Sequence, residues 1–212
     1  MLKLPAGLSN VALIALISLV ISGCHKERSY PVYRENPAPK DALPIVIRVH
    51  DAPVEVPTPK VSVTYEIDPL CLPPINNYEG VQYEPNQHTV EPPVRRISAT
   101  EFSSTLYKDG MEVADYYGSG PCTWTPVLVV ASFDFIIDDR PIQATAWSSF
   151  TKIEDEERSI TYVNRALPPM IPGEFPEWTP TESSKWYEKM SKAERQKYFP
   201  IEISQWIEGA IP

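Results

Sequence analysis

Proline is the residue that most restricts the fold of this chain. The 212 residues include 24 prolines, about 11% against a usual share of ~5%. A proline inside a helix removes a backbone hydrogen bond and clashes with the preceding turn, so long helices cannot dominate. Strands can form between the prolines. Residues 61–67 alternate apolar and polar side chains, a pattern typical of a half-buried strand.

Further strand-forming runs continue as far as residue 164. They are rich in β-branched and aromatic residues and cover residues 45–49, 95–107, 111–117, 127–136, 142–150 and 159–164. Asp109-Gly110 predicts a hairpin turn between the 95–107 and 111–117 runs, and Asp138-Asp139 predicts another turn. Because strands predominate and no helical pattern lies between them, we predict a mainly β fold. The expected architecture is an antiparallel β-sandwich over residues 45–166.

The sequence after residue 166 has a different character. Five prolines between residues 167 and 180 predict an extended strap. Residues 181–199 then show helical spacing, and Ser191 and Glu194 fit a capping box that would start a second short helix. We therefore expect residues 167–212 to pack on the sandwich as a proline-rich strap and a short C-terminal helical segment.

The first 24 residues have the pattern of an export signal. Lys3 precedes an apolar run at residues 11–21, which is too short to cross a ~30 Å hydrocarbon core. The run leads directly into Ile21-Ser22-Gly23-Cys24, which resembles the lipobox of bacterial lipoproteins. The resemblance implies that residues 1–23 are a signal peptide. It also implies that Cys24 receives fatty acyl chains, such as palmitate, and becomes the first residue of the mature protein.

The resemblance also implies a location. His25 follows the cysteine, where an aspartate tends to retain enterobacterial lipoproteins in the inner membrane, so the expected anchor is the outer membrane, facing the periplasm. Two or more acyl chains anchor a protein stably in a bilayer. Residues 24–44 mix prolines with charges and are expected to form a tether. The mature chain would carry 18 basic and 28 acidic side chains, a net charge of −10, which argues against nucleic acid as a partner.

Two cysteines remain once Cys24 is assigned to lipid. Cysteine pairs in exported proteins form disulfides in the oxidising compartment, so we predict a disulfide between Cys71 and Cys122. The bond would close a loop of 122 − 71 = 51 residues. A thiol nucleophile and a metal site are the alternatives, but the spacing is not the Cys-x-x-Cys that favours either of them.

Each candidate catalytic or metal-binding pattern in the sequence is incomplete or has a structural explanation. Gly118-Ser119-Gly120-Pro121 weakly resembles the surroundings of a serine protease nucleophile, but a tight turn explains it equally well. The chain has three histidines, and none has the spacing of a zinc site. The acidic clusters lack the pattern of a calcium loop. We therefore expect no enzymatic activity, no cofactor and no metal.

Aromatic residues offer a candidate binding surface. Tyr and Trp are favoured at recognition surfaces, and they gather in the long loop at residues 68–94 and around Cys122; the candidates are Tyr78, Tyr83, Tyr116, Tyr117 and Trp124. The alternative is that they line the core. We expect a lipid-anchored, protein-binding module, such as an inhibitor or immunity protein against a periplasmic toxin. A structural lipoprotein of an outer-membrane-docked assembly and a cell-wall-acting enzyme are the alternatives.

Overall fold

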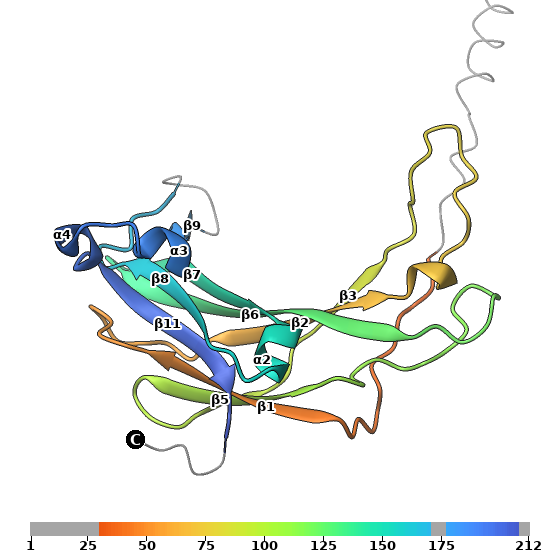
Figure 1. Cartoon of the computed structure of the whole chain (residues 1–212), viewed down its shortest axis with the longest axis horizontal. Helices are drawn as coiled ribbons and strands as arrows, with labels where there is room; N and C mark the ends of the chain where they lie inside the picture. The colour runs from red at the N-terminus through yellow and green to blue at the C-terminus, as the bar shows by residue number, and fades with distance from the viewer. Residues whose placement is uncertain (1–29, 171–176, 208–212) are drawn as a thin grey trace, which may run out of the picture. The chain divides into compact units, whose positions relative to one another are not determined.

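Two β-sheets face each other in the computed structural model, which describes residues 30–170 and 177–207 (Figure 1). One sheet has six strands in the order β10-β8-β11-β1-β5-β4, and the other has five in the order β3-β2-β6-β7-β9. The chain is mainly β, and the predicted sandwich is confirmed. All strand pairs are antiparallel except the short pair of β7 and β9.

Most strands lie close to where the sequence predicts them, but residues 87–90, 177–178, 181–183 and 198–205 also form strands, and the sequence predicts none there. Their bounds are β1 Ala42–Val49, β2 Lys60–Ile67, β3 Gln87–Val90, β4 Val94–Arg96, β5 Glu101–Tyr107, β6 Trp124–Ile137, β7 Arg140–Ser149, β8 Ser159–Asn164, β9 Glu177–Trp178, β10 Thr181–Ser183 and β11 Tyr198–Gln205. The helices are short: η1 Pro69–Cys71, α2 Phe150–Glu154, α3 Ser184–Tyr187 and α4 Lys192–Arg195.

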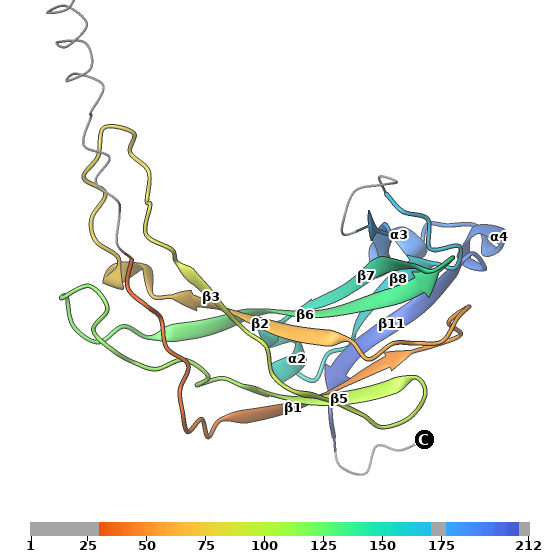
Figure 2. The ribbon, with the colours of Figure 1, turned by 180° about the vertical axis from the view of Figure 1, so that it is seen from behind.

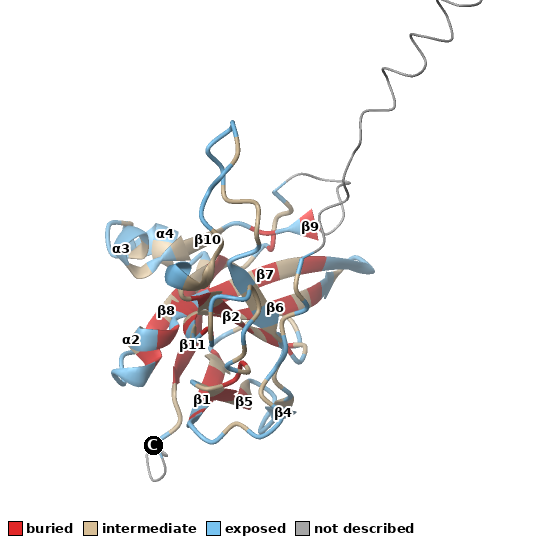
Figure 3. Ribbon diagram, turned by 90° about the vertical axis from the view of Figure 1, so that its right-hand side faces the viewer, coloured by how far each residue is buried: buried red, intermediate tan, exposed pale blue. Residues whose placement is uncertain are grey.

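The core lies between the two sheets because every second side chain of the long strands points inward. In β2 the inward side chains belong to Val61, Val63, Tyr65 and Ile67, and all four are buried. Figure 3 shows buried residues along the strands and exposed residues on the loops and short helices. Phe133 and Phe135 of β6 are fully buried, and Phe135 contacts Phe199 edge-to-face across the sandwich.

Strand β11 completes the six-stranded sheet, although the sequence prediction placed no strand there. It lies between β8 and β1 and pairs with both (Figure 1). Phe199, Ile201 and Ile203 are fully buried, so this C-terminal segment supplies part of the core. Pro200 pairs with β8 but lies beyond the end of the β1 pairing, where a missing N–H costs little.

The hairpin predicted around Asp109-Gly110 does not form, because residues 111–117 do not pair with β5 as a second strand. The chain does turn after β5, but Met111 pairs with Glu35 instead of returning along β5. Only glycine fits at position 110, because the Cβ of any other residue there would collide with the Tyr65 hydroxyl. The turn at Asp138 and Asp139 forms as predicted, and both residues have positive φ.

Short helices occur in the C-terminal segment as expected. Residues 181–199 contain α3 and α4, and the capping box of Ser191 and Glu194 starts α4. Part of the predicted strap, residues 171–176, and the tail at residues 208–212 lie outside the described residues.

The predicted tether is bound to the sandwich over most of its described length. From Pro31 onward the described residues form one compact unit. The backbone N–H of Asn36 donates to the carbonyl of Gly110 at 2.9 Å, and that of Glu112 donates to the carbonyl of Arg34 at 2.9 Å. Arg34 also forms an ion pair with Glu112 at 2.5 Å. Residues 31–41 are therefore a fixed arm and not a free spacer, and β1 begins at Ala42.

Candidate functional site

Three of the predicted binding residues hold the arm in place. The ring of Tyr33 meets Tyr116 and Trp124 edge-to-face, with centroid distances of 5.2 and 4.6 Å. Its hydroxyl lies 2.5 Å from that of Tyr117 and donates to the carbonyl of Pro85. Burial, followed by the contact with Tyr117, raises the pKa of Tyr33. Tyr116, Tyr117 and Trp124 thus come together, and what they bind in this structure is the chain's own arm.

The loop at residues 68–86 carries the other two predicted residues. It projects from the end of the sandwich at which the arm begins (Figures 1 and 2). Tyr78 is fully exposed, whereas Tyr83 is half-buried. Three aliphatic side chains of the same loop are also exposed: those of Leu70, Ile75 and Val81.

Hydrogen bonds within the 68–86 loop give it a defined shape. The Asn77 amide side chain donates to the carbonyl of Val81 at 2.7 Å and accepts from its N–H at 3.1 Å, which closes the tip. At the base, Asp68 accepts from the N–H of Leu70 at 2.9 Å and starts η1. The backbone of Asp68 donates to Thr123 at 3.0 Å, joining the loop to the segment before β6.

Cys71 and Cys122 lie side by side but are not bonded in this structure. Cys122 is buried, and Cys71 lies at the base of the 68–86 loop. Burial, followed by the neighbouring Cys122 thiol, raises the pKa of Cys71 to about 11. Reduced Cys71 is therefore protonated at neutral pH, which makes it a poor nucleophile. The predicted pair is close in space, and the formation of the bond remains a prediction.

Ser119, which the sequence places in a protease-like setting, lies in a turn. Gly118 and Gly120 have positive φ, and the Asp115 carboxylate accepts hydrogen bonds from the backbone of Gly118 and Ser119 at 2.6 and 3.1 Å. These contacts are those of an aspartate-initiated turn that leads to Cys122.

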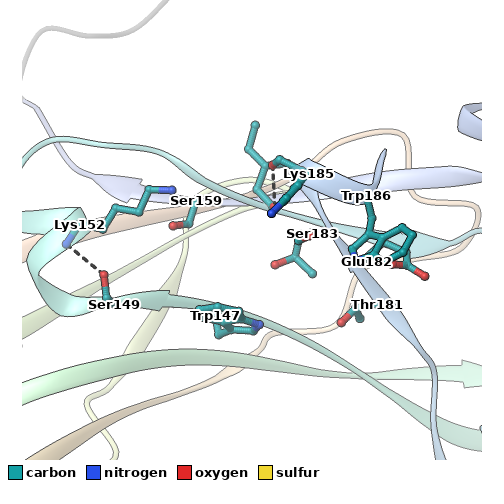
Figure 4. Close-up of a pocket in the computed structure, with 12 residues that line it drawn as sticks. Trp147, Ser149, Lys152, Ser159, Thr181, Glu182, Ser183, Lys185 and Trp186 are labelled. Atoms are coloured by element: carbon teal, nitrogen blue, oxygen red, sulfur yellow. Dashed lines mark hydrogen bonds between the residues drawn. The ribbon is translucent and has the colours of Figure 1, made fainter. Parts of the chain in front are cut away.

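A cleft that the sequence did not reveal lies between the edges of the two sheets. It has a volume of about 590 Å³ and is lined by β7, α2, β8, β10 and α3 (Figure 4). Trp147 comes from β7 and Trp186 from α3, and both indoles are more than half exposed. We call this the tryptophan cleft. No local signal could have found it, because the two tryptophans are 39 residues apart (186 − 147) and line one cleft only through the sheet order.

Hydroxyl groups dominate the rest of the tryptophan cleft. Six of its lining residues carry one: Ser149, Ser159, Thr161, Thr181, Ser183 and Ser184. Lys152, Lys185 and Glu182 add charges at its walls. Ser183 occupies the cap position of α3, yet its side chain makes no capping hydrogen bond. The cleft therefore combines two flat apolar surfaces with many small hydrogen-bonding groups.

Other sequence predictions concern residues that the structure does not describe or does not test. Cys24, its lipobox and the signal peptide lie outside the described residues. Among residues 30–170 and 177–207, no helix is long and apolar enough to cross a membrane. In that same part of the chain, no group of three or more His, Cys, Asp or Glu side chains is placed to hold a metal.

Comparisons with protein-family models, curated proteins and solved structures found no match.

Proposed function

We propose that this chain is an exported lipoprotein, anchored through Cys24, that binds another envelope protein through the 68–86 loop. The anchor is supported by the lipobox at residues 21–24, which follows an apolar run of signal-peptide length. The binding role rests on one observation: four large apolar side chains are exposed on a single ordered loop, those of Leu70, Ile75, Tyr78 and Val81. Concentrated exposed apolar surface marks an interaction site.

The chemistry of the 68–86 loop favours a partner with a basic or concave site. The loop holds Asp68, Glu79 and Glu84 and no lysine or arginine. Opposite charge on a partner would speed association and select against other partners. Because the tip is already closed by Asn77, binding would lose little conformational entropy. These properties suit an inhibitor, such as an immunity protein against a periplasmic toxin.

The short stretch between Cys24 and the fixed arm limits how far Pro31 can lie from an anchored Cys24. Pro31, where the compact unit begins, is 31 − 24 = 7 positions after Cys24, with six residues between them. A fully extended chain spans at most ~3.6 Å per residue, so these residues reach no more than ~25 Å. A lipid-anchored sandwich would therefore stay close to the bilayer, and so would its partner.

Comparative capture from envelope extracts tests the binding role. Tagged wild-type protein should retain a partner that the Leu70→Ser/Tyr78→Ser variant loses. Val113→Ser is the matched control, because Val113 is an exposed aliphatic residue outside the loop. Retention of the same proteins by all three forms would refute the role of the loop.

Survival assays separate an inhibitor from a structural component. A strain lacking the gene should be killed by neighbouring toxin producers, and the wild-type gene should restore survival where the loop variant does not. An exported Cys24→Ser form should still protect if the protein acts as an inhibitor. Its complete failure, together with loss of an envelope assembly, would favour the structural alternative.

A further inference from the structure

The tryptophan cleft is separate from the loop that we assign to protein binding. One of its walls is α3, which lies at the opposite end of the sandwich from the 68–86 loop (Figures 1 and 2). Its volume of about 590 Å³ falls within the ~300–1,000 Å³ typical of small-molecule sites. From its lining we infer that this cleft binds a short oligosaccharide.

The two indoles provide the apolar part of such a site. Trp147 is 55% exposed and Trp186 is 61% exposed, although tryptophan is highly buried on average. A pyranose ring has a face of C–H groups that packs flat against an indole, whose π-face carries partial negative charge. Lys189 places its Nζ 5.3 Å from the Trp186 ring centroid, and this cation–π contact helps to fix the orientation of that indole.

The hydroxyl groups provide the polar part. Sugar hydroxyls both donate and accept hydrogen bonds, and so do serine and threonine side chains. Three of the cleft hydroxyls are already bonded: that of Ser149 accepts from the N–H of Lys152 at 3.3 Å, that of Ser159 pairs with Ser148 at 2.7 Å, and that of Ser184 donates to the carbonyl of Ile160 at 3.3 Å. The Ser183 hydroxyl, which caps nothing, is left for a ligand, and Figure 4 shows it in the space between β10 and Trp147.

An extended peptide fits this cleft less well. A peptide that added a strand would need a row of backbone groups on a free sheet edge. Strand β10 offers only Thr181–Ser183 before α3 begins, and Pro180 before it has no N–H to donate. A helical ligand would need an apolar groove, whereas serine, threonine and charged side chains outnumber apolar ones here.

Calorimetric titration of the full-length protein, held in a non-glycosidic detergent, tests the proposal. The probes are chitotetraose and cellotetraose, which share their linkage and differ in the acetamido group. We expect at least one to bind, with a change in tryptophan fluorescence. Trp147→Ala and Trp186→Ala should each weaken binding about tenfold, which is ~1.4 kcal/mol.

Matched variants distinguish a binding site from a change in folding. Trp178 is 51% exposed and does not line the cleft, so Trp178→Ala should bind as the wild type does. Trp147→Phe should recover part of the affinity because it keeps an aromatic face. If neither chitotetraose nor cellotetraose binds at millimolar concentration, the proposal is overturned. So would equal weakening by Trp178→Ala, or stronger binding of a short peptide of alternating threonine and valine.

Discussion

Replacing Tyr33 with alanine should release the arm at residues 31–41 while the two sheets stay folded. Each of the edge-to-face contacts with Tyr116 and Trp124 is expected to contribute ~0.5–1.5 kcal/mol beyond the burial of area. The two hydrogen bonds of its hydroxyl, with Tyr117 and to the carbonyl of Pro85, add about 1 kcal/mol each. The arm should therefore lose about 3–5 kcal/mol of local stability, which corresponds to a roughly 150- to 5,000-fold rise in its opening.

Amide hydrogen exchange reports this opening directly. The N–H groups of Asn36 and Glu112 bond across the junction between arm and sandwich, to Gly110 and Arg34. Their protection should fall in the Tyr33→Ala protein, while that of Val63, whose strand lies in the five-stranded sheet, should not change. The Tyr33→Phe control keeps both ring contacts and loses only the two hydroxyl hydrogen bonds, about 2 kcal/mol. Unchanged protection at both reporter amides in Tyr33→Ala would refute the account of the arm.

Three further outcomes follow from the fold. Ile203→Ala should lower the free energy of unfolding by ~2–5 kcal/mol in denaturant titrations, because it opens a cavity in the core; a loss below 0.5 kcal/mol would contradict the place of β11. Hydrogen bonds from the backbone of Lys40 and then Asp41 lower the pKa of the Asp109 carboxyl. These hydrogen bonds stabilise the arm above the ordinary pKa of an aspartate, and their contribution is lost as the pH falls through the lowered pKa of Asp109. The exchange protection of the Lys40 amide should therefore fall in acid. Asp109→Asn should abolish this pH dependence. Protein from an oxidising compartment should contain a bond between Cys71 and Cys122, and its reduction should cost about 4 kcal/mol of stability; two free thiols in the exported protein would contradict this.

Most of the sandwich could be predicted because its signals are local. The alternation in residues 61–67 and the turn at residues 138–139 each specify their own structure, whatever the rest of the chain does. Strand β11 had a similar signal in the alternating Phe199, Ile201 and Ile203. The proline at position 200 masked it, because it also fits the end of a helix.

The features that could not be predicted from the sequence are formed by segments that lie far apart along the chain. The hairpin after Gly110 failed because Met111 pairs with Glu35, about 76 residues away, and loop closure of that kind leaves no local mark. Trp124 was predicted to bind a partner from its residue type and its place among aromatic residues near Cys122, but its ring packs against Tyr33 of the arm. The tryptophan cleft arises from the order of strands in two sheets, which no pattern in either β7 or α3 encodes.

Mass analysis of the N-terminus of the mature protein, purified from the envelope, tests whether Cys24 is the lipid anchor. We expect a chain that begins at Cys24 and carries the mass of acyl chains on that residue. A chain that still begins with Met1 and has an unmodified Cys24 would contradict the anchor, the oxidising compartment and the membrane-proximal partner together.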